Sequence, residues 1–508
     1  MSKPGDSKNE EIIDLLVIGG GINGCAIARD AAGRGLNVTL CEKDDLASHT
    51  SSASTKLIHG GLRYLENYDF LLVRHSLKER EILLNSAPHI IWPLRFILTH
   101  HEGLRPRWLL RLGLFLYDHI GGRKKLPVSN GVNLKEHVAG RFLQSKYTHA
   151  FEYSDCWVQD ARLVVLNARD AENHGARILT HTACTGLQRQ QQNWIVNIQD
   201  ELTGKPSTIV AKAIVNASGP WVENTVDLYA QKEPGRSIRL VKGSHIIVKK
   251  LFDHVHPYIF QNSDGRIVFA IPFEQDFTLL GTTDVDYQGD PGQVKISPQE
   301  IDYICKAVSE YAGIPVNPQQ VIWSYSGVRP LFGDKSGNAS KVSRDYELEL
   351  DLNGAPVVTV YGGKITTSRV LAQQVMDLLE SPLQIHQPAW TEKSILPGGD
   401  IEQANFSQFL KGCYLRYSWL DESIVMDYCR NYGMAIHHIL EHCEQTKDLG
   451  EYFGGGLYQC EVVYLINSEW VQSVDDILWR RTKKGLKLNS DEKEKLKQWL
   501  SDYHSQKN

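Results

Sequence analysis

The sequence predicts an α/β fold followed by a helical domain, and three observations predict it. An apolar strand at 15–18 runs into glycines, a small-residue helix and a second strand that ends at residue 42. A later apolar strand, at 211–216, ends in small residues and a Gly-Pro turn. After a Pro/Gly break at 394–400, Leu, Ile, Tyr and Trp recur at helical spacing. The 508 residues allow about three domains.

The composition excludes several classes of protein. The 55 Lys and Arg residues nearly balance the 60 Asp and Glu residues, so no overall attraction to nucleic acid is expected. The nine cysteines lack the paired spacing of metal sites, which predicts reduced thiols and no bound metal. The polar, acidic N-terminus resembles neither a signal nor a transit peptide. No apolar stretch approaches the roughly 18 residues of a spanning helix, so we expect a cytoplasmic protein that does not cross a membrane.

The first element is the glycine motif Gly19-x-Gly21-x-x-Gly24 between the first strand and the helix. Gly19 permits the tight turn, Gly21 lets backbone approach a pyrophosphate, and Gly24 lets the helix pack on the strand. Glu42 ends the second strand, where a carboxylate accepts hydrogen bonds from ribose hydroxyls. Although a glycine turn without a ligand is the structural alternative, the complete unit predicts a site for FAD or NAD.

The segment after Glu42 favours FAD. A simple NAD fold would continue with alternating helices and strands, whereas this chain enters a long polar loop before a helix expected at 70–84. The loop offers hydroxyls and a glycine pair that lets backbone approach a flat ring or a phosphate: Ser51, Ser52, Ser54, Gly60 and Gly61. The strand at 211–216 returns the chain to the cofactor after a long insertion, as flavin folds do, and brings Ser218 and Gly219.

Motifs from residue 15 to residue 486 resemble, in order, those of the aerobic, FAD-dependent glycerol-3-phosphate dehydrogenases. They are "VIGGGINGCAIARDAAGRG", "SSASTKLIHGGLRYLE", "FEYSDCWVQDARLV", "NASGPWV", "RLVKGSH", "GTTDVDYQGDP", "YSGVRPL", "SRDYEL", "YGGKITTSR" and "LWRRTKKGL". The resemblance implies an FAD-binding Rossmann-like domain of the amino-acid-oxidase type, a substrate domain on an antiparallel sheet and a helical C-terminal domain. It also adds Gly363 to the cofactor candidates.

The domains are expected to be discontinuous. We assign the FAD-binding domain to 10–85, 150–230 and 345–385, the substrate and membrane-facing domain to 86–149 and 231–344, and the helical domain to 390–508.

The implied reaction oxidises sn-glycerol 3-phosphate to dihydroxyacetone phosphate, with electrons passing through FAD to a membrane quinone. Two alternatives stay open. One is an FAD-dependent amino-acid oxidase of the same fold that uses oxygen. The other is a non-enzymatic flavin-binding protein associated with a membrane.

This reaction needs cations for the phosphate and a group that takes the hydroxyl proton. The candidate cations, each within a motif, are Arg63, Arg329, Arg344 and Lys364. Arg329, on a turn next to Pro330, is also a candidate for orienting the hydroxyl and stabilising oxyanion charge. Tyr64 and Thr282 are candidate supporting donors, and His245 and His59 are candidate bases. The structural alternative for each residue is a salt-bridging or packed side chain.

One segment is expected to join the two sites. We expect the serines and glycine pair of residues 51–61 to contact the cofactor, while Arg63 and Tyr64 contact the substrate.

The segment 104–125, "LRPRWLLRLGLFLYDHIGGRKK", is basic, aromatic and amphipathic. Such a helix can lie in an anionic membrane surface, which predicts a peripheral location on the inner face of the cytoplasmic membrane. A core helix with solvated basic ends is the alternative. The C-terminal helices are a candidate homodimer interface.

Overall fold

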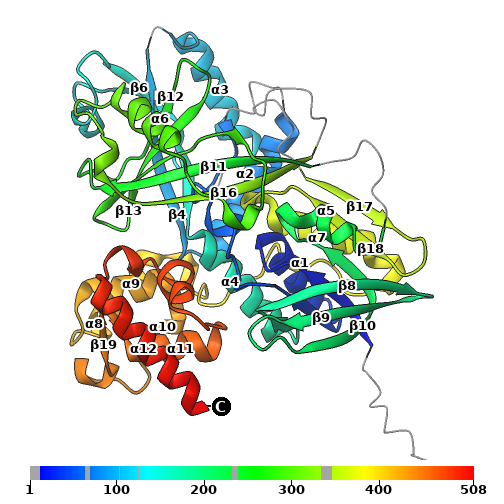
Figure 1. Cartoon of the computed structure of the whole chain (residues 1–508). Helices are drawn as coiled ribbons and strands as arrows, with labels where there is room; N and C mark the ends of the chain where they lie inside the picture. The colour runs from blue at the N-terminus through cyan, green and yellow to red at the C-terminus, as the bar shows by residue number, and fades with distance from the viewer. Residues whose placement is uncertain are drawn as a thin grey trace, which may run out of the picture.

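The computed structural model describes residues 12–62, 69–101, 103–122, 125–230, 238–332 and 346–507. Two sheets and a helical C-terminal domain make up these residues (Figure 1). The fold expected from the sequence is confirmed, including the antiparallel character of the second sheet.

The first sheet has a parallel centre with antiparallel strands attached. Its main path runs β17-β18-β10-β1-β2-β7, and β8 and β9 extend it beside β10. The bounds are β1 Ile13–Ile18, β2 Val38–Cys41, β7 Arg177–Leu179, β8 Thr182–Gln190, β9 Asn193–Asp200, β10 Pro206–Asn216, β17 Glu347–Asp351 and β18 Val357–Tyr361. The central strands β1, β2 and β18 are mostly apolar and buried, as is the second half of β10, because helices cover them.

Three helices cover this sheet on one side. They are α1 (Ile22–Gly33), α4 (Asp160–Asn173) and α7 (Ser368–Leu383), and α1 packs against both of the others. The small face of α1, with Cys25, Ala28 and Ala31 fully buried, allows this close approach. Segments more than 300 residues apart in sequence therefore share one core.

The second sheet follows the path β15-β11-β14-β13-β12-β4-β6-β3, with β16 on β11 and β5 on β6. The bounds are β3 Leu57–Ile58, β4 Ile91–His100, β5 Asn130–Asn133, β6 His149–Val158, β11 Ile238–Lys249, β12 Tyr258–Gln261, β13 Ile267–Phe273, β14 Phe277–Gly281, β15 Val285–Asp286 and β16 Val321–Phe332. The helix α6 (Pro298–Ser309) packs on one face, and α2 (Phe70–Ser86) and α3 (Arg107–Ile120) contribute to the core on the other.

One expected domain boundary differs from the structure. The segment 150–230 is expected in the FAD-binding domain, but β6 pairs along ten residues with β4 and belongs to the antiparallel sheet. The division therefore lies after Val158. The short strand β3 also pairs with β6, so residues within 10–85 reach into the second sheet.

The C-terminal domain is helical and has its own core. Its elements are α8 Phe406–Arg416, α9 Glu422–Tyr432, α10 Ile436–Ile439, α11 Gln459–Ser468, α12 Ser490–Lys507 and a hairpin of β19 Tyr452–Gly454 and β20 Leu457–Tyr458. A π-helical turn at Asp476–Arg481 faces the rest of the chain. In the part of the chain that the structure describes, no helix has the length and apolarity to cross a membrane.

Candidate active site

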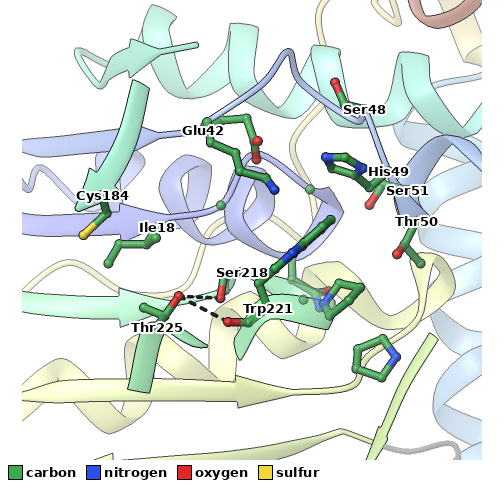
Figure 2. A pocket seen from close by; sticks show the side chains of 18 of the residues that line it. Ile18, Glu42, Ser48, His49, Thr50, Ser51, Cys184, Ser218, Trp221 and Thr225 are labelled. Atoms are coloured by element: carbon green, nitrogen blue, oxygen red, sulfur yellow. Dashed lines mark hydrogen bonds between the residues drawn. The ribbon is translucent and has the colours of Figure 1, made fainter. Parts of the chain in front are cut away.

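A cavity of about 330 Å³ lies where the parallel strands end (Figure 2). Carboxyl ends of parallel strands meet at one edge of a sheet, and ligands bind in the crevice outside that edge. Here β1 ends before Gly19, β2 before Glu42, β10 before Ala217 and β18 before Gly362. The predicted cofactor residues among the lining are Gly19, Gly21, Glu42, Ser51, Ser218, Gly219 and Gly363.

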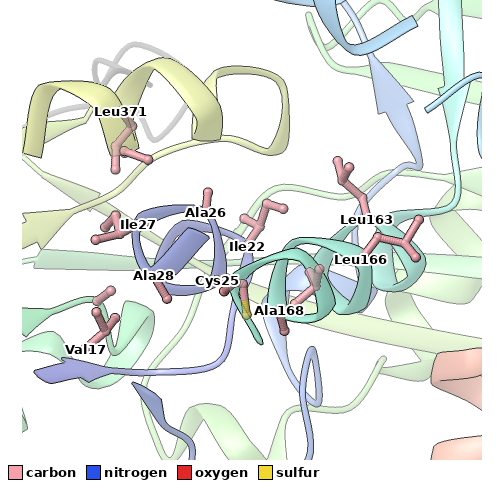
Figure 3. Packing of buried hydrophobic residues seen from close by; sticks show 14 of the residues in the cluster. Val17, Ile22, Cys25, Ala26, Ile27, Ala28, Leu163, Leu166, Ala168 and Leu371 are labelled. Carbon is pink, nitrogen blue, oxygen red and sulfur yellow. The ribbon is translucent and has the colours of Figure 1, made fainter. Parts of the chain in front are cut away.

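The glycines of the motif leave no room for side chains. Gly19 has φ +113°, and a Cβ there would lie 2.6 Å from the carbonyl oxygen of Ala217. A Cβ on Gly24 would lie 1.9 Å from the carbonyl oxygen of Gly19. Gly24 is outside the cavity lining, and a Cβ on it would lie 3.5 Å from the side chain of Val17. Figure 3 shows Val17 of β1 and the buried residues Cys25 and Ala28 of α1. Gly19 thus shapes the turn, and Gly24 sets the helix-to-strand distance.

Glu42, expected to accept hydrogen bonds from ribose hydroxyls, also holds two segments of backbone together. Its two carboxylate oxygens accept from the backbone N–H of Gly20 (2.6 Å) and of Asp44 (2.9 Å). Burial raises the pKa of the Glu42 carboxyl, and the two N–H donors oppose that rise. The side chain lines the cavity while it ties the glycine turn to the loop after β2.

Of the three loop serines expected to contact the cofactor, one lines the cavity and two do not. The Ser51 hydroxyl lines the cavity and accepts from the N–H of Ile22 at 2.9 Å, which fixes the start of α1. Ser52 donates to the carbonyl of His49, and Ser54 donates to Asp160 at 2.8 Å. Neither Ser52 nor Ser54 lines the cavity.

The glycine pair also lies outside the lining. The Gly60 N–H donates to the Tyr117 hydroxyl at 2.8 Å, and a Cβ on Gly60 would collide with Leu77. Gly61 adopts φ +75°. Gly60 thus allows close packing with α2 and α3, and neither glycine lines the cavity.

The predicted base His245 lies on β11, opposite Tyr325 of β16. Its ring stacks on Tyr325, with centroids 4.8 Å apart, and its Nε2 lies 3.0 Å from the Thr55 hydroxyl. The buried Nδ1 has no hydrogen-bond partner within the described residues. Burial, followed by the charges of Lys56 and Arg329, holds the pKa of His245 well below 6.5. His245 is therefore a neutral imidazole at neutral pH.

Arg329 lies on the same face of the sheet as His245. Val241 pairs with Arg329 and His245 with Tyr325, and residues two apart on a strand share a face. Arg329 forms an ion pair with Asp284 and donates to the carbonyl of Thr283. A Cβ on Gly243 would lie 2.9 Å from the Thr282 hydroxyl and 3.0 Å from Arg329 Nη2, so these two predicted residues meet beside Gly243.

Residues 50–55 connect the cavity to this face. Thr50 and Ser51 line the cavity, and the Thr50 hydroxyl also donates to the carbonyl of Val328 at 2.7 Å. A Cβ on Gly327 would lie 2.8 Å from the Cβ of Ala53, and Tyr325 donates to the carbonyl of Ser54. Pro330, next to Arg329, lines the cavity too. The cavity and the His245–Arg329 face are therefore adjacent.

The remaining predicted site residues are Lys364 and His59, which the structure describes, and three residues outside the description. Lys364 is half-buried and follows Gly363 of the lining, and the backbone N–H of half-buried His59 donates to Thr366. Arg63, Tyr64 and Arg344 lie outside the described residues. The expected joining of two sites by Arg63 and Tyr64 therefore stays a prediction.

Residues 14–369 match the family described as FAD dependent oxidoreductase, and residues 389–501 match the C-terminal domain of alpha-glycerophosphate oxidase. The chain belongs to the FAD-dependent oxidoreductases. The family resemblance found in the sequence is confirmed, and FAD is the cofactor.

Two curated relatives of this oxidoreductase match it over almost their full lengths. It is 47% identical to the aerobic glycerol-3-phosphate dehydrogenase of Escherichia coli (strain K12), over 98% of this chain and 99% of that one. It is 48% identical to the D-erythritol 1-phosphate dehydrogenase of Brucella abortus, over 97% and 98%. The X-ray structure of the glycerol-3-phosphate dehydrogenase from Bacillus halodurans complexed with FAD superposes with a TM-score of 0.80 at 28% identity, covering 98% and 91%.

The cavity of this oxidoreductase fits FAD. A Cβ atom on the glycines of the turn would fill this part of the cavity. Because glycine has none, backbone N–H groups and the start of α1 can face a pyrophosphate.

The lining also holds residues that sequence reasoning missed. Lys43 lies over the Trp221 ring, 3.8 Å from its centroid, and His49 contacts Asp44 at 2.7 Å. Lys43 and His49 are near the predicted residues Glu42 and Ser51 in the sequence, and this proximity could have indicated them. Thr182 and Cys184 on β8 lie in no motif, so no sequence signal indicated them.

A cluster outside the cavity bears on the expected absence of metal. One ligand atom each of His137, Glu152 and His256 lies within 4.8 Å of the others. Glu152 pairs with Arg95 at 2.6 Å and with His256 at 3.3 Å, and these contacts lower its pKa to about 2. The ring of His137 accepts from the N–H of Ala139. Because the donor atoms already have protein partners, we assign no metal here.

Proposed function

We propose that the protein oxidises sn-glycerol 3-phosphate to dihydroxyacetone phosphate and passes the electrons to a membrane quinone. The support is the 47% identity to an aerobic glycerol-3-phosphate dehydrogenase along the whole chain. The adjoining neutral His245 and cationic Arg329, next to the cofactor cavity, fit this chemistry.

Three residues of the site have separate roles in this reaction. FAD, held by the residues that line the cavity, would supply the acceptor for the hydride from C2. His245 takes the hydroxyl proton: when Nε2–H donates to Thr55, the lone pair lies on Nδ1. Arg329 orients the alcohol oxygen and stabilises its developing negative charge. Lys364 supplies a further positive charge for the phosphate.

Adding substrate to the oxidised protein without oxygen tests this proposal. We expect sn-glycerol 3-phosphate to bleach the visible flavin band, and glycerol and a D-amino acid to leave it unchanged. Bleaching by the amino acid alone would replace the proposal with an amino-acid oxidase. An unchanged band with FAD present would indicate a binding protein.

A second candidate substrate is D-erythritol 1-phosphate, because the relative that carries this name is equally similar. Both compounds present a secondary alcohol and a phosphomonoester, so the residues above suit either. Comparing kcat/KM for the two separates them, and a higher value for the erythritol ester would reassign the substrate. The bleaching experiment should include this ester as a fourth sample.

The quinone acceptor requires contact with a membrane, and α3 supports such contact. Trp108, Leu112 and Phe115 lie along one side of this helix and are 69%, 48% and 51% exposed, while Leu114 and Tyr117 are buried. This exposed aromatic side favours contact with a membrane surface over the alternative of a core helix with solvated basic ends. Arg107 and Arg111 flank the exposed side chains and suit anionic lipid.

Exchanging these side chains should weaken membrane binding. We expect the variant W108A/F115A to bind vesicles containing phosphatidylglycerol about tenfold more weakly, because the buried apolar area falls. Co-flotation at low and high salt measures this. The control is L415A, which removes an 82% exposed leucine of α8. Equal binding of all variants, or no binding by the parent, would contradict the proposal.

A further inference from the structure

The loop after β2, residues 42–51, forms one wall of the cofactor cavity, and we call it the cofactor loop. It contributes Glu42, Lys43, Ser48, His49 and Ser51 to the lining. Its backbone is tied to the glycine turn, because the Ala47 N–H donates to the carbonyl of Gly20 at 3.1 Å. Small shifts of this loop would therefore move several cofactor contacts together.

Asp45, in the middle of the loop, is not part of the lining and is only 1% exposed. Arg481 donates to both of its oxygens, at 2.6 and 2.7 Å, and Arg480 donates a third bond at 2.6 Å. Arg481 is fully buried and also donates to the carbonyl of Glu469 at 3.1 Å. Both arginines belong to the π-helical turn of the C-terminal domain, and Arg481 is 436 positions from Asp45.

The two-point contact between Arg481 and Asp45 fixes the position of the cofactor loop. A guanidinium fork that meets a carboxylate at two atoms restricts both distance and orientation. Removing Arg481 leaves the buried Asp45 carboxylate with only the single bond from Arg480, and this weaker hold is expected to let the loop shift. The Asp45 carboxylate would then have to move toward water and would carry Glu42 and Ser48 with it.

We propose that Arg481, assisted by Arg480, is a positioning residue for FAD: by holding Asp45, the C-terminal domain sets the shape of the cofactor loop. FAD binding and docking of the C-terminal domain are then coupled, and each strengthens the other by the same factor. The proposal rests on FAD as the cofactor and not on the identity of the substrate.

The interface offers a matched control. Arg162 of α4 forms a two-point ion pair with Glu469, with side chains 2% and 0% exposed, and also donates to the carbonyl of Asn431. It joins the same two parts of the chain with equal burial but does not contact the cofactor loop. Its loss should destabilise the interface, while Arg481 keeps its two bonds to Asp45 and the cofactor loop keeps its position.

The test compares R481Q, D45N, the double variant and R162Q in the full chain. FAD is removed from each purified protein and titrated back, and the Kd is taken from quenching of flavin fluorescence. We expect R481Q and D45N each to raise Kd by tenfold or more, and the double variant to raise it by less than the product of the two. R162Q should lower Tm while Kd stays within twofold of the parent.

Two outcomes overturn the proposal. One is a Kd for R481Q within twofold of the parent with a Tm as low as that of R162Q. The other is an equal rise of Kd in R481Q and R162Q. If R481Q does not fold, D45N and R481K take its place, and R481K should lie between parent and D45N because it keeps the charge and loses the fork. Since no substrate is used, failure of the proposed reaction leaves this result unaffected.

Discussion

Replacing Arg329 with alanine is expected to lower kcat/KM for sn-glycerol 3-phosphate by about 10²- to 10³-fold, the usual loss when a donor to a developing oxyanion is removed. The guanidinium lies beside Gly243 together with the Thr282 hydroxyl, on the face that carries His245. Its loss also leaves Asp284 without this ion-pair partner, and that negative charge would repel a phosphate ester. Steady-state kinetics with the phosphate ester measures the loss.

The matched control for this variant is R266A. Arg266 lies at the start of β13 in the same sheet and pairs with a nearby aspartate, Asp264, as Arg329 does with Asp284. R266A should keep kcat/KM within about twofold of the parent, since exposed ion pairs contribute little. R329K should recover part of the activity, because it keeps the charge but lacks the fork. A loss below threefold in R329A would remove Arg329 from the chemistry.

Substituting Gly24 with alanine is expected to weaken FAD binding about 5- to 150-fold, which corresponds to an overpacking cost of about 1–3 kcal/mol. The added Cβ would start 1.9 Å from the Gly19 carbonyl oxygen, which is backbone and cannot rotate away. The helix α1 must therefore move off β1, and the N–H groups that face the cavity move with it. The ratio of flavin to protein absorbance after purification reports the result.

Gly412 provides the comparison for Gly24. It lies within α8, and a Cβ there meets nothing within 4 Å. G412A should bind FAD like the parent and should be slightly more stable, because alanine favours a helix over glycine. If G24A retains full flavin content, the close helix-to-strand contact is not what organises the cavity.

The sequence predicted features whose cause is local. The spacing of Gly19, Gly21 and Gly24 encodes one turn and one helix start, and Glu42 follows from the end of the next strand. The serines show the limit of such reasoning. A hydroxyl-rich segment indicates that hydrogen-bond donors are present but does not indicate where they point. The Ser54 hydroxyl donates to Asp160 and does not line the cavity.

Other features depend on pairings that a single sequence does not display. The bond between Asp45 and Arg481 joins opposite ends of the chain, and no spacing rule connects them. The expected boundary at residue 150 lies too early, because the partner of β6, the strand β4, is identified only by the fold. The neutral state of His245 likewise comes from its burial against Tyr325 and from two nearby cations.

The strand order of the first sheet has a consequence for synthesis of the chain. β1 lies between β2 and β10, β10 in turn needs β18, and α7 completes the cover of α1. At about 5–20 residues per second, roughly tens of seconds separate the emergence of β1 from the ribosome and that of β18. For that time the apolar strand β1 has no complete sheet to join. We therefore expect nascent chains that stop before β18 to depend on chaperones and to aggregate when released.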